Sequence, residues 1–167
     1  PHGYDHKYVY SHFGYNLKAT DLQAAIGVAQ LKKLPSFVER RRHNFARLRA
    51  ALVDMEDFFV LPEATEHAAP SWFGFLLTCR DGIDRTAVVR HIEEQGIQTR
   101  MLFAGNLTKH PCFDEMRASG EGYRIVGALT ETDRIMNDTF WLGVYPGLTD
   151  EKIDYMAQII KDAVRGS

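Results

Sequence analysis

The chain has 167 residues, of which 45% are hydrophobic and 25% charged, with a formal net charge of −2. This composition is typical of a compact globular protein and excludes a disordered or strongly basic chain. Cys79 and Cys112 form no closely spaced pair, which predicts neither a disulfide framework nor a zinc site. This cysteine usage fits a reducing cytoplasm best. No apolar run approaches the roughly 20 residues that span a bilayer, so we expect no membrane contact.

The first helix is expected to begin after Thr20, because Thr20 and Gln23 form a capping-box pattern. Residues 1–4 contain neither an apolar signal core nor an initiator Met, so we expect a chain that was processed or begins within a longer protein. Leu22 and Ile26 lie at helical spacing beside small residues such as Gly27. This pattern predicts a large neighbour against the helix, and self-association through the small-residue face.

A second helix is expected over residues 37–53. Pro35 discourages continuation of the first helix, and Ser36 with Glu39 makes another capping box. The two helices would form a hairpin. Five arginines crowd the second helix at positions 40, 41, 42, 47 and 49. They are interpreted as a solvated face rather than a nucleic-acid footprint, since the whole chain is slightly acidic and the run has no interleaved aromatics suited to base stacking.

The residues after the second expected helix predict a small sheet covered by helices. Strands are expected at residues 58–61, 71–78, 97–103 and 140–144, and helices at 85–95, from 130 onward, and after Thr149. Residues 104–123 contain several glycines and a proline, which predicts a loop. A third capping pair is expected between Thr130 and Asp133. The fold class is therefore α+β, with an antiparallel or mixed sheet.

No autonomous catalytic motif is present. The chain contains no glycine-rich phosphate loop, no HExxH pair and no G-x-S-x-G elbow. His2 and His6 are spaced for a helical metal pair, yet they lie in a Gly/Tyr-rich terminus, so no metal site is expected.

Several strings resemble a known family. Residues 14–18, 23–27 and 40–42 are similar to the C-terminal third of the DegT/StrS-type sugar aminotransferases, which are fold type I pyridoxal-phosphate enzymes. The resemblance is closer to the iron–sulfur branch of that family, at residues 4–8, 71–75, 99–107, 132–137 and 139–147. It implies a domain organisation of three parts: the end of the large cofactor domain (1–20), a long helical connection (21–55) and a small C-terminal α+β domain (56–167).

The resemblance implies a dehydrase that removes the 3-hydroxyl of CDP-4-keto-6-deoxyglucose in lipopolysaccharide O-antigen biosynthesis. Such enzymes use pyridoxamine or pyridoxal 5′-phosphate together with a 2Fe-2S cluster. The cofactor supplies the electron-withdrawing chemistry, and the protein binds and orients it. The implied partners are a second subunit, forming a homodimer, and a flavin/iron–sulfur reductase. The Schiff-base residue and the cluster cysteines precede Pro1 in that branch. We therefore expect no catalytic residue and no metal ligand in this chain, and no activity from it alone.

Two residues are implied as cofactor ligands. A Gly-x-Asn turn of the family reaches across the dimer to the neighbour's cofactor phosphate, which points to Asn16, and Lys18 stands where the aminotransferases commonly carry arginine. A neutral amide can hold a phosphate without adding charge. The alternatives are an ordinary asparagine in a turn and a surface lysine.

Arg100 and Arg134 are candidates for contacting the sugar nucleotide, because a guanidinium presents a fixed fork of donors to phosphate. The alternative is structural pairing with nearby acids such as Asp133. Asn106 and His110 lie in the loop after a predicted strand, where a sugar aminotransferase often places a polar residue against its substrate.

Three aromatic residues complete the candidate substrate site: Phe73, Phe75 and Phe103 either shape the hexose pocket or pack the sheet. Two other functions stay open beside the dehydrase. A sugar-nucleotide aminotransferase predicts lysine at the upstream Schiff-base position and no clustered cysteines. A non-catalytic dimerisation or ligand-binding module predicts a chain that begins naturally near Pro1.

Overall fold

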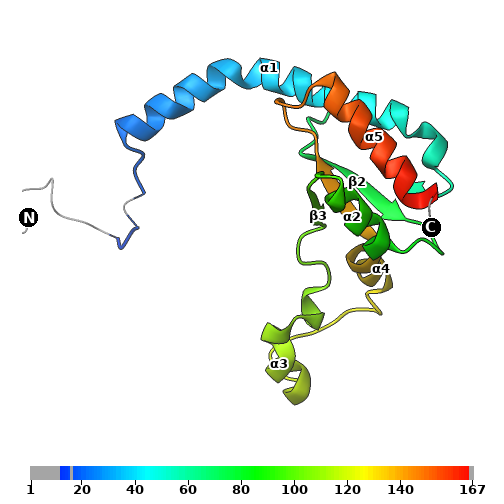
Figure 1. The fold of residues 1–167 in the computed structure, drawn as a ribbon. Helices are drawn as coiled ribbons and strands as arrows, with labels where there is room; N and C mark the ends of the chain where they lie inside the picture. The colour runs from blue at the N-terminus through cyan, green and yellow to red at the C-terminus, as the bar shows by residue number, and fades with distance from the viewer. Residues whose placement is uncertain (1–11, 16, 166–167) are drawn as a thin grey trace, which may run out of the picture. The chain divides into compact units, whose positions relative to one another are not determined.

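The computed structural model describes residues 12–15 and 17–165. Contacts divide the chain into two units, Pro1–Pro35 and Ser36–Ser167. The helices are α1 (Asp21–Ala51), α2 (Arg85–Glu94), α3 (Asp114–Ser119), α4 (Thr130–Asp138) and α5 (Asp150–Arg165), and the strands are β1 (Phe59–Val60), β2 (Gly74–Cys79), β3 (Thr99–Met101) and β4 (Thr139–Gly143) (Figure 1). Among the described residues, no helix is both long enough and apolar enough to cross a membrane.

Helix α1 is one continuous helix, so the expected hairpin is wrong. Its capping box is confirmed: the Thr20 amide donates to Gln23 Oε1 (2.9 Å), and the Gln23 amide donates to Thr20 Oγ1 (3.3 Å). Pro35 lies inside the helix rather than at a break. A proline removes one backbone hydrogen bond, and strong helix formers at residues 31–34 and from Glu39 onward favour the helix before and after it. Ser36 therefore starts no new helix.

All neighbouring strands of the sheet are antiparallel, in the order β1-β2-β4-β3. Strand β4 pairs with both β2 and β3, so β2 and β3 run in the same direction on either side of it. Helix α2 makes the crossover between them. The expected strand–helix–strand unit is thus confirmed, with the last strand of the chain inserted into its middle.

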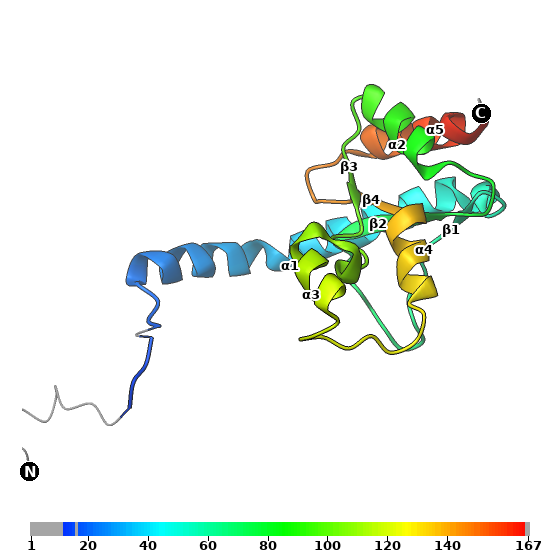
Figure 2. The ribbon, with the colours of Figure 1, turned by 90° about the horizontal axis from the view of Figure 1, so that it is seen from below.

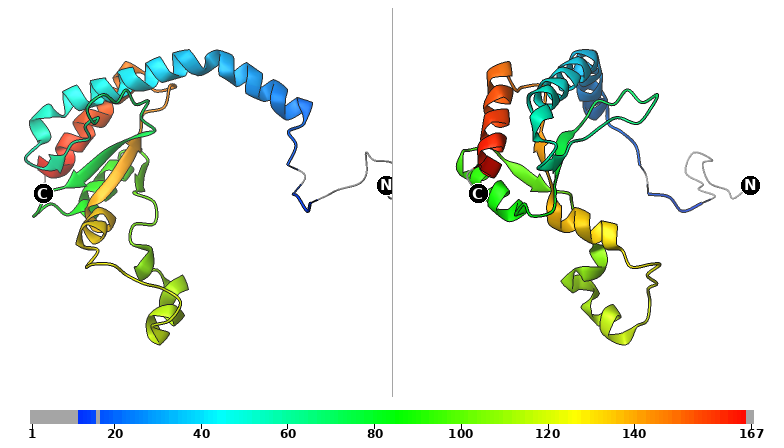
Figure 3. Two further views of the ribbon diagram at one scale, coloured as in Figure 1. Left: turned by 180° about the vertical axis from the view of Figure 1, so that it is seen from behind. Right: turned by 90° about the vertical axis from the view of Figure 1, so that its right-hand side faces the viewer.

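One face of the sheet forms the core. Phe75 and Leu77 of β2 and Phe140 and Leu142 of β4 are all fully buried, alternating with residues on the opposite face. The helices contribute Phe45, Leu48, Val88, Ile92, Ile153, Met156, Ile160 and Val164 to the same cluster. Figures 2 and 3 show α2 and α5 on one side of the sheet and α4 toward the other.

Residues 104–123 are more ordered than expected. The predicted loop contains two one-turn 3-10 helices, Leu107–Lys109 and Pro111–Phe113, followed by α3. Helix α4 begins at Thr130 as expected, but no side chain caps it and the preceding Leu129 is left-handed at φ 52°. The expected Thr130–Asp133 capping pair does not form because the Asp133 carboxylate binds Asn106 and Lys109 instead.

Candidate functional site

The arginines of α1 brace the domain rather than forming a solvated face, which corrects the prediction. Arg40 donates to the Leu148 carbonyl (2.7 Å) and to Asp150 (2.8 Å). Arg41 donates to the Trp72 carbonyl (3.2 Å). The other three engage backbone carbonyls or carboxylates at Ala69, Pro70, Asp150, Asp154, Pro62 and Glu63. These contacts hold the β4–α5 turn and the segment before β2 against α1.

A hollow of about 510 Å³ lies where β3 begins and β4 ends, beside the first turns of α5. It is lined by Gly96, Ile97, Gln98, Arg100, Trp141, Gly143, Tyr145, Leu148, Lys152, Tyr155 and Met156. The lining residues include two cations and three aromatic rings, and no carboxylate. Its volume falls within the range of small-molecule sites, roughly 300–1,000 Å³.

The walls of the hollow are fixed by contacts behind them. The Trp141 indole Nε1 donates to the Met101 carbonyl (3.2 Å), and its ring lies 5.0 Å from the Phe73 ring. The Tyr155 hydroxyl donates to the Gln95 carbonyl (3.2 Å). Arg100 donates from Nη1 to the Thr99 carbonyl (2.8 Å), which leaves further guanidinium donors for a ligand.

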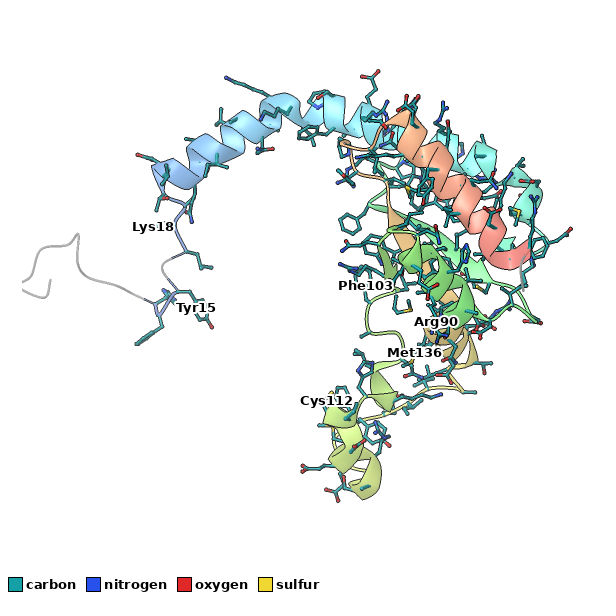
Figure 4. The ribbon with its side chains drawn as sticks, in the orientation of Figure 1. Tyr15, Lys18, Arg90, Phe103, Cys112 and Met136 are labelled. Carbon is teal, nitrogen blue, oxygen red and sulfur yellow. The ribbon has the colours of Figure 1, made fainter. Side chains whose placement is uncertain are left out.

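A second group of predicted residues lies in the loop after β3. Phe103 adopts a left-handed conformation at φ 48° and is 79% exposed (Figure 4). Gly105 also has a positive φ, and a Cβ at this glycine would meet Met136 of α4. The loop thus lies close against α4 at Gly105.

Asn106 anchors this loop from within. It is 3% exposed, donates to Asp133 Oδ1 (2.7 Å) and accepts hydrogen bonds from the Thr108 amide and hydroxyl (3.1 and 2.6 Å). Lys109 pairs with the other Asp133 oxygen (2.7 Å). The hydrogen bonds from Lys109 and Asn106 lower the pKa of Asp133 below its usual value. Asn106 therefore supports the loop, and a contact with substrate stays a prediction.

The remaining predicted substrate residues are separated by the fold. Phe75 is fully buried and packs against Phe45, which matches the core-packing alternative. Phe73 is exposed, with the Arg41 guanidinium 5.8 Å above its ring. Arg134 lies on α4, exposed, with its guanidinium 3.9 Å from the Asp81 carboxylate. The structure thus brings Arg100 and Phe73 together around Trp141, and places Phe103, Asn106 and Arg134 around α4.

His110 completes the second group. Its Nε2 lies 2.7 Å from the Ala104 carbonyl oxygen, a contact that ties the two ends of the loop together. His110 therefore helps to hold the loop together. A contact between His110 and the substrate stays a prediction.

The predicted cofactor ligands belong to the first unit. Asn16 lies outside the described residues. Lys18 lies in the exposed segment just before α1 (Figure 4). Among residues 12–15 and 17–165, no group of three His, Cys, Asp or Glu side chains is placed to hold a metal ion.

Trp141, Lys152 and Tyr155 were missed by the sequence analysis as candidate site residues. Lys152 and Tyr155 lie on the helix predicted after Thr149, at a spacing of three that places them on one face. A cation and an aromatic residue on one helical face were a usable signal. Their position opposite Arg100 depends on the packing of α5 on β3 and β4, which no local pattern encodes.

The four-stranded antiparallel sheet and its covering helices form a small α+β domain. Residues 1–161 match the model of the DegT/DnrJ/EryC1/StrS aminotransferase family, and the chain belongs to that family.

Two curated relatives match nearly the whole chain. The lipopolysaccharide biosynthesis protein RfbH of Salmonella typhimurium is 54% identical over 93% of this chain. The dTDP-4-dehydro-2,6-dideoxy-D-glucose 3-dehydratase of Saccharopolyspora spinosa is 49% identical over 100% of it. The chain spans 35% of the length of each relative.

Solved structures show the same fold. The E. coli GDP-4-keto-6-deoxy-D-mannose-3-dehydratase with bound hydrated PLP superposes with a TM-score of 0.78 at 24% identity, covering 92% of this chain and 38% of that one. An aminotransferase from Psychrobacter cryohalolentis gives a TM-score of 0.79 at 20% identity, covering 99% and 45%. The predicted α+β class and its place in fold type I enzymes are confirmed.

Proposed function

We propose that this chain is the C-terminal part of a nucleotide-sugar 3-dehydratase acting in lipopolysaccharide biosynthesis. The observation that carries the proposal is the identity of 54% to RfbH and 49% to a sugar 3-dehydratase along nearly every residue of the chain. The proposed substrate is CDP-4-keto-6-deoxyglucose, and the reaction is removal of its 3-hydroxyl. We further propose a homodimer, with a flavin/iron–sulfur reductase as the electron donor.

The described residues do not by themselves form a complete cofactor site. Lys18 stands in an exposed segment, and the polar groups of Asn106 and Asp133 are already satisfied by one another and by Thr108 and Lys109. We propose that the Schiff-base residue and the ligands of any 2Fe-2S cluster precede Pro1 in the complete protein. Asn16 and Lys18 are proposed to add contacts to the cofactor phosphate.

This chain's own contribution is to hold the sugar nucleotide. Arg100 and Arg134 present guanidinium groups suited to phosphate, and Phe73 and Phe103 present exposed rings. Asn106 holds the Phe103 loop in place.

The test begins with the reading frame upstream of Pro1. Histidine at the Schiff-base position together with clustered cysteines supports the dehydratase, whereas lysine without those cysteines supports an aminotransferase. The complete protein, supplied with pyridoxamine phosphate, reductase and the CDP-sugar, should release a product lacking the 3-hydroxyl. A product carrying a new amino group at C4 would overturn the proposal, as would a start codon just before Pro1.

A further inference from the structure

The hollow beside α5 has an unbalanced positive charge. Arg100 comes from β3 and Lys152 from the first turn of α5, and the residues that line the hollow with them include no aspartate or glutamate. Cations from two elements that line one concave surface raise the local concentration of anions. The ligand favoured by this arrangement carries negative charge.

The aromatic rings around the cations favour a ligand that also carries a flat ring. Trp141 is held from behind by Phe73 and the Met101 carbonyl, and Tyr155 is held by the Gln95 carbonyl. Tyr145 and Tyr155 are each about half exposed at the rim. Side chains already fixed in position lose little conformational entropy on binding, and an aromatic side chain provides a flat face on which a nucleobase stacks.

We propose that this hollow binds the nucleoside diphosphate part of a nucleotide-linked sugar. Arg100 and Lys152 bind the diphosphate, and the base lies against Trp141, Tyr145 or Tyr155. The choice of a nucleotide, among anions of similar size, rests on the proposed function. The hollow lies at the start of β3 and the 103–110 loop follows its end, so the proposal assigns the nucleotide and the sugar to the two ends of one strand.

The experiment is a titration of the 167-residue chain with CDP, followed residue by residue in ¹H–¹⁵N spectra. The expected result is saturable shifts of the Gln98 and Gly143 amides and of the Trp141 indole signal. Lys152→Gln should weaken CDP binding about tenfold, because one charge-assisted hydrogen bond is lost. Arg100→Gln should do the same.

Arg90→Gln is the matched control, since Arg90 is an exposed arginine on α2 outside the hollow (Figure 4). This variant should bind CDP as the unchanged chain does. Circular dichroism of each variant verifies the fold, and Lys152 is an exposed helical residue whose replacement leaves the core intact.

Inorganic pyrophosphate and cytidine separate the contributions of the two halves of the ligand. Pyrophosphate should shift signals near Arg100 and Lys152 and bind more weakly than CDP. Equal affinity for pyrophosphate and CDP would reduce the hollow to a phosphate site and overturn the nucleotide assignment. Two results would overturn the proposal that the hollow binds the nucleotide. One is CDP shifts confined to the 103–110 loop and α4, and the other is no CDP binding at millimolar concentration. Neither result bears on the upstream histidine and cysteines, so the proposed function is judged separately.

Discussion

Arg40 in α1 and Asp150 at the start of α5 are joined by a hydrogen-bonded ion pair, with Nη2 2.8 Å from Oδ1, although 110 positions separate them in the chain. The same guanidinium donates to the Leu148 carbonyl (2.7 Å). Asp150 also lies 3.0 Å from His43 Nε2 and 3.3 Å from Arg47 Nη1. One carboxylate thus ties α1 to the turn that forms one wall of the hollow.

The ion cluster predicts how stability depends on pH. Hydrogen bonds from His43 and then Arg40 hold the pKa of Asp150 below its ordinary value of 3.8. A lowered folded-state pKa means that the folded protein binds fewer protons than the unfolded chain near that pH. The stabilisation is therefore fully present above the unfolded pKa and is lost as the pH falls through the folded one.

Asp150→Asn should lower the thermal midpoint at pH 7 and leave a smaller loss on acidification from pH 5 to pH 2. Thermal melts followed by circular dichroism across that range measure both. Asp57→Asn, at an exposed position before β1, is the control and should follow the unchanged chain. Parallel pH curves for Asp150→Asn and the unchanged chain would rule out the cluster as a source of acid sensitivity.

Gly74 in β2 makes room for the Trp141 indole on the neighbouring strand. A Cβ at Gly74 would overlap the tryptophan ring, whereas a Cβ at Gly143 would meet only a Tyr145 ring carbon 3.9 Å away. Gly74→Ala should therefore destabilise the chain by about 1–3 kcal/mol, the usual range for overpacking. Urea unfolding measures it, with Gly143→Ala as the matched control. Equal effects from the two alanines would show that the indole moves aside freely.

Asn106 should hold the loop after β3. Asn106→Ala removes the buried partner of Asp133 and of the Thr108 amide, and we expect a loss of about 1–3 kcal/mol in unfolding free energy. Amide hydrogen exchange should accelerate over residues 103–110 before it does in β2 or β4. Asn137→Ala, at an exposed position on α4, should change stability by less than about 0.5 kcal/mol. Unchanged exchange in the loop of Asn106→Ala would contradict the anchoring role.

The two cysteines should differ sharply in reactivity. Burial raises the pKa of the Cys79 thiol to about 12, so almost no thiolate forms near neutrality, while Cys112 is exposed (Figure 4). Iodoacetamide at pH 8 should modify Cys112 in the folded chain and Cys79 only after unfolding, as peptide mass spectrometry will show. Cys112→Ser should leave the folded chain essentially unlabelled. Rapid labelling of Cys79 in that variant would mean that the β2 core opens readily.

The local parts of this protein could be predicted from the sequence alone. The Thr20–Gln23 capping box, the strand–helix–strand order and the apolar face of α5 follow from contacts within a few residues. These features depend on residues that lie close together in the chain, so the sequence pattern predicts them correctly.

Only the tertiary structure decided which residues act on one another across the chain. The α1 arginines looked solvated because their partners, such as Leu148 and Asp154, lie about 100 positions away. The diversion of Asp133 from capping to Asn106, 27 positions away, was hidden for the same reason. The continuity of α1 through Pro35 reflects instead a local balance between the proline and its flanking helix formers. The hollow is likewise a product of packing, because Arg100 of β3 and Lys152 of α5 line it only once α5 is folded against the sheet.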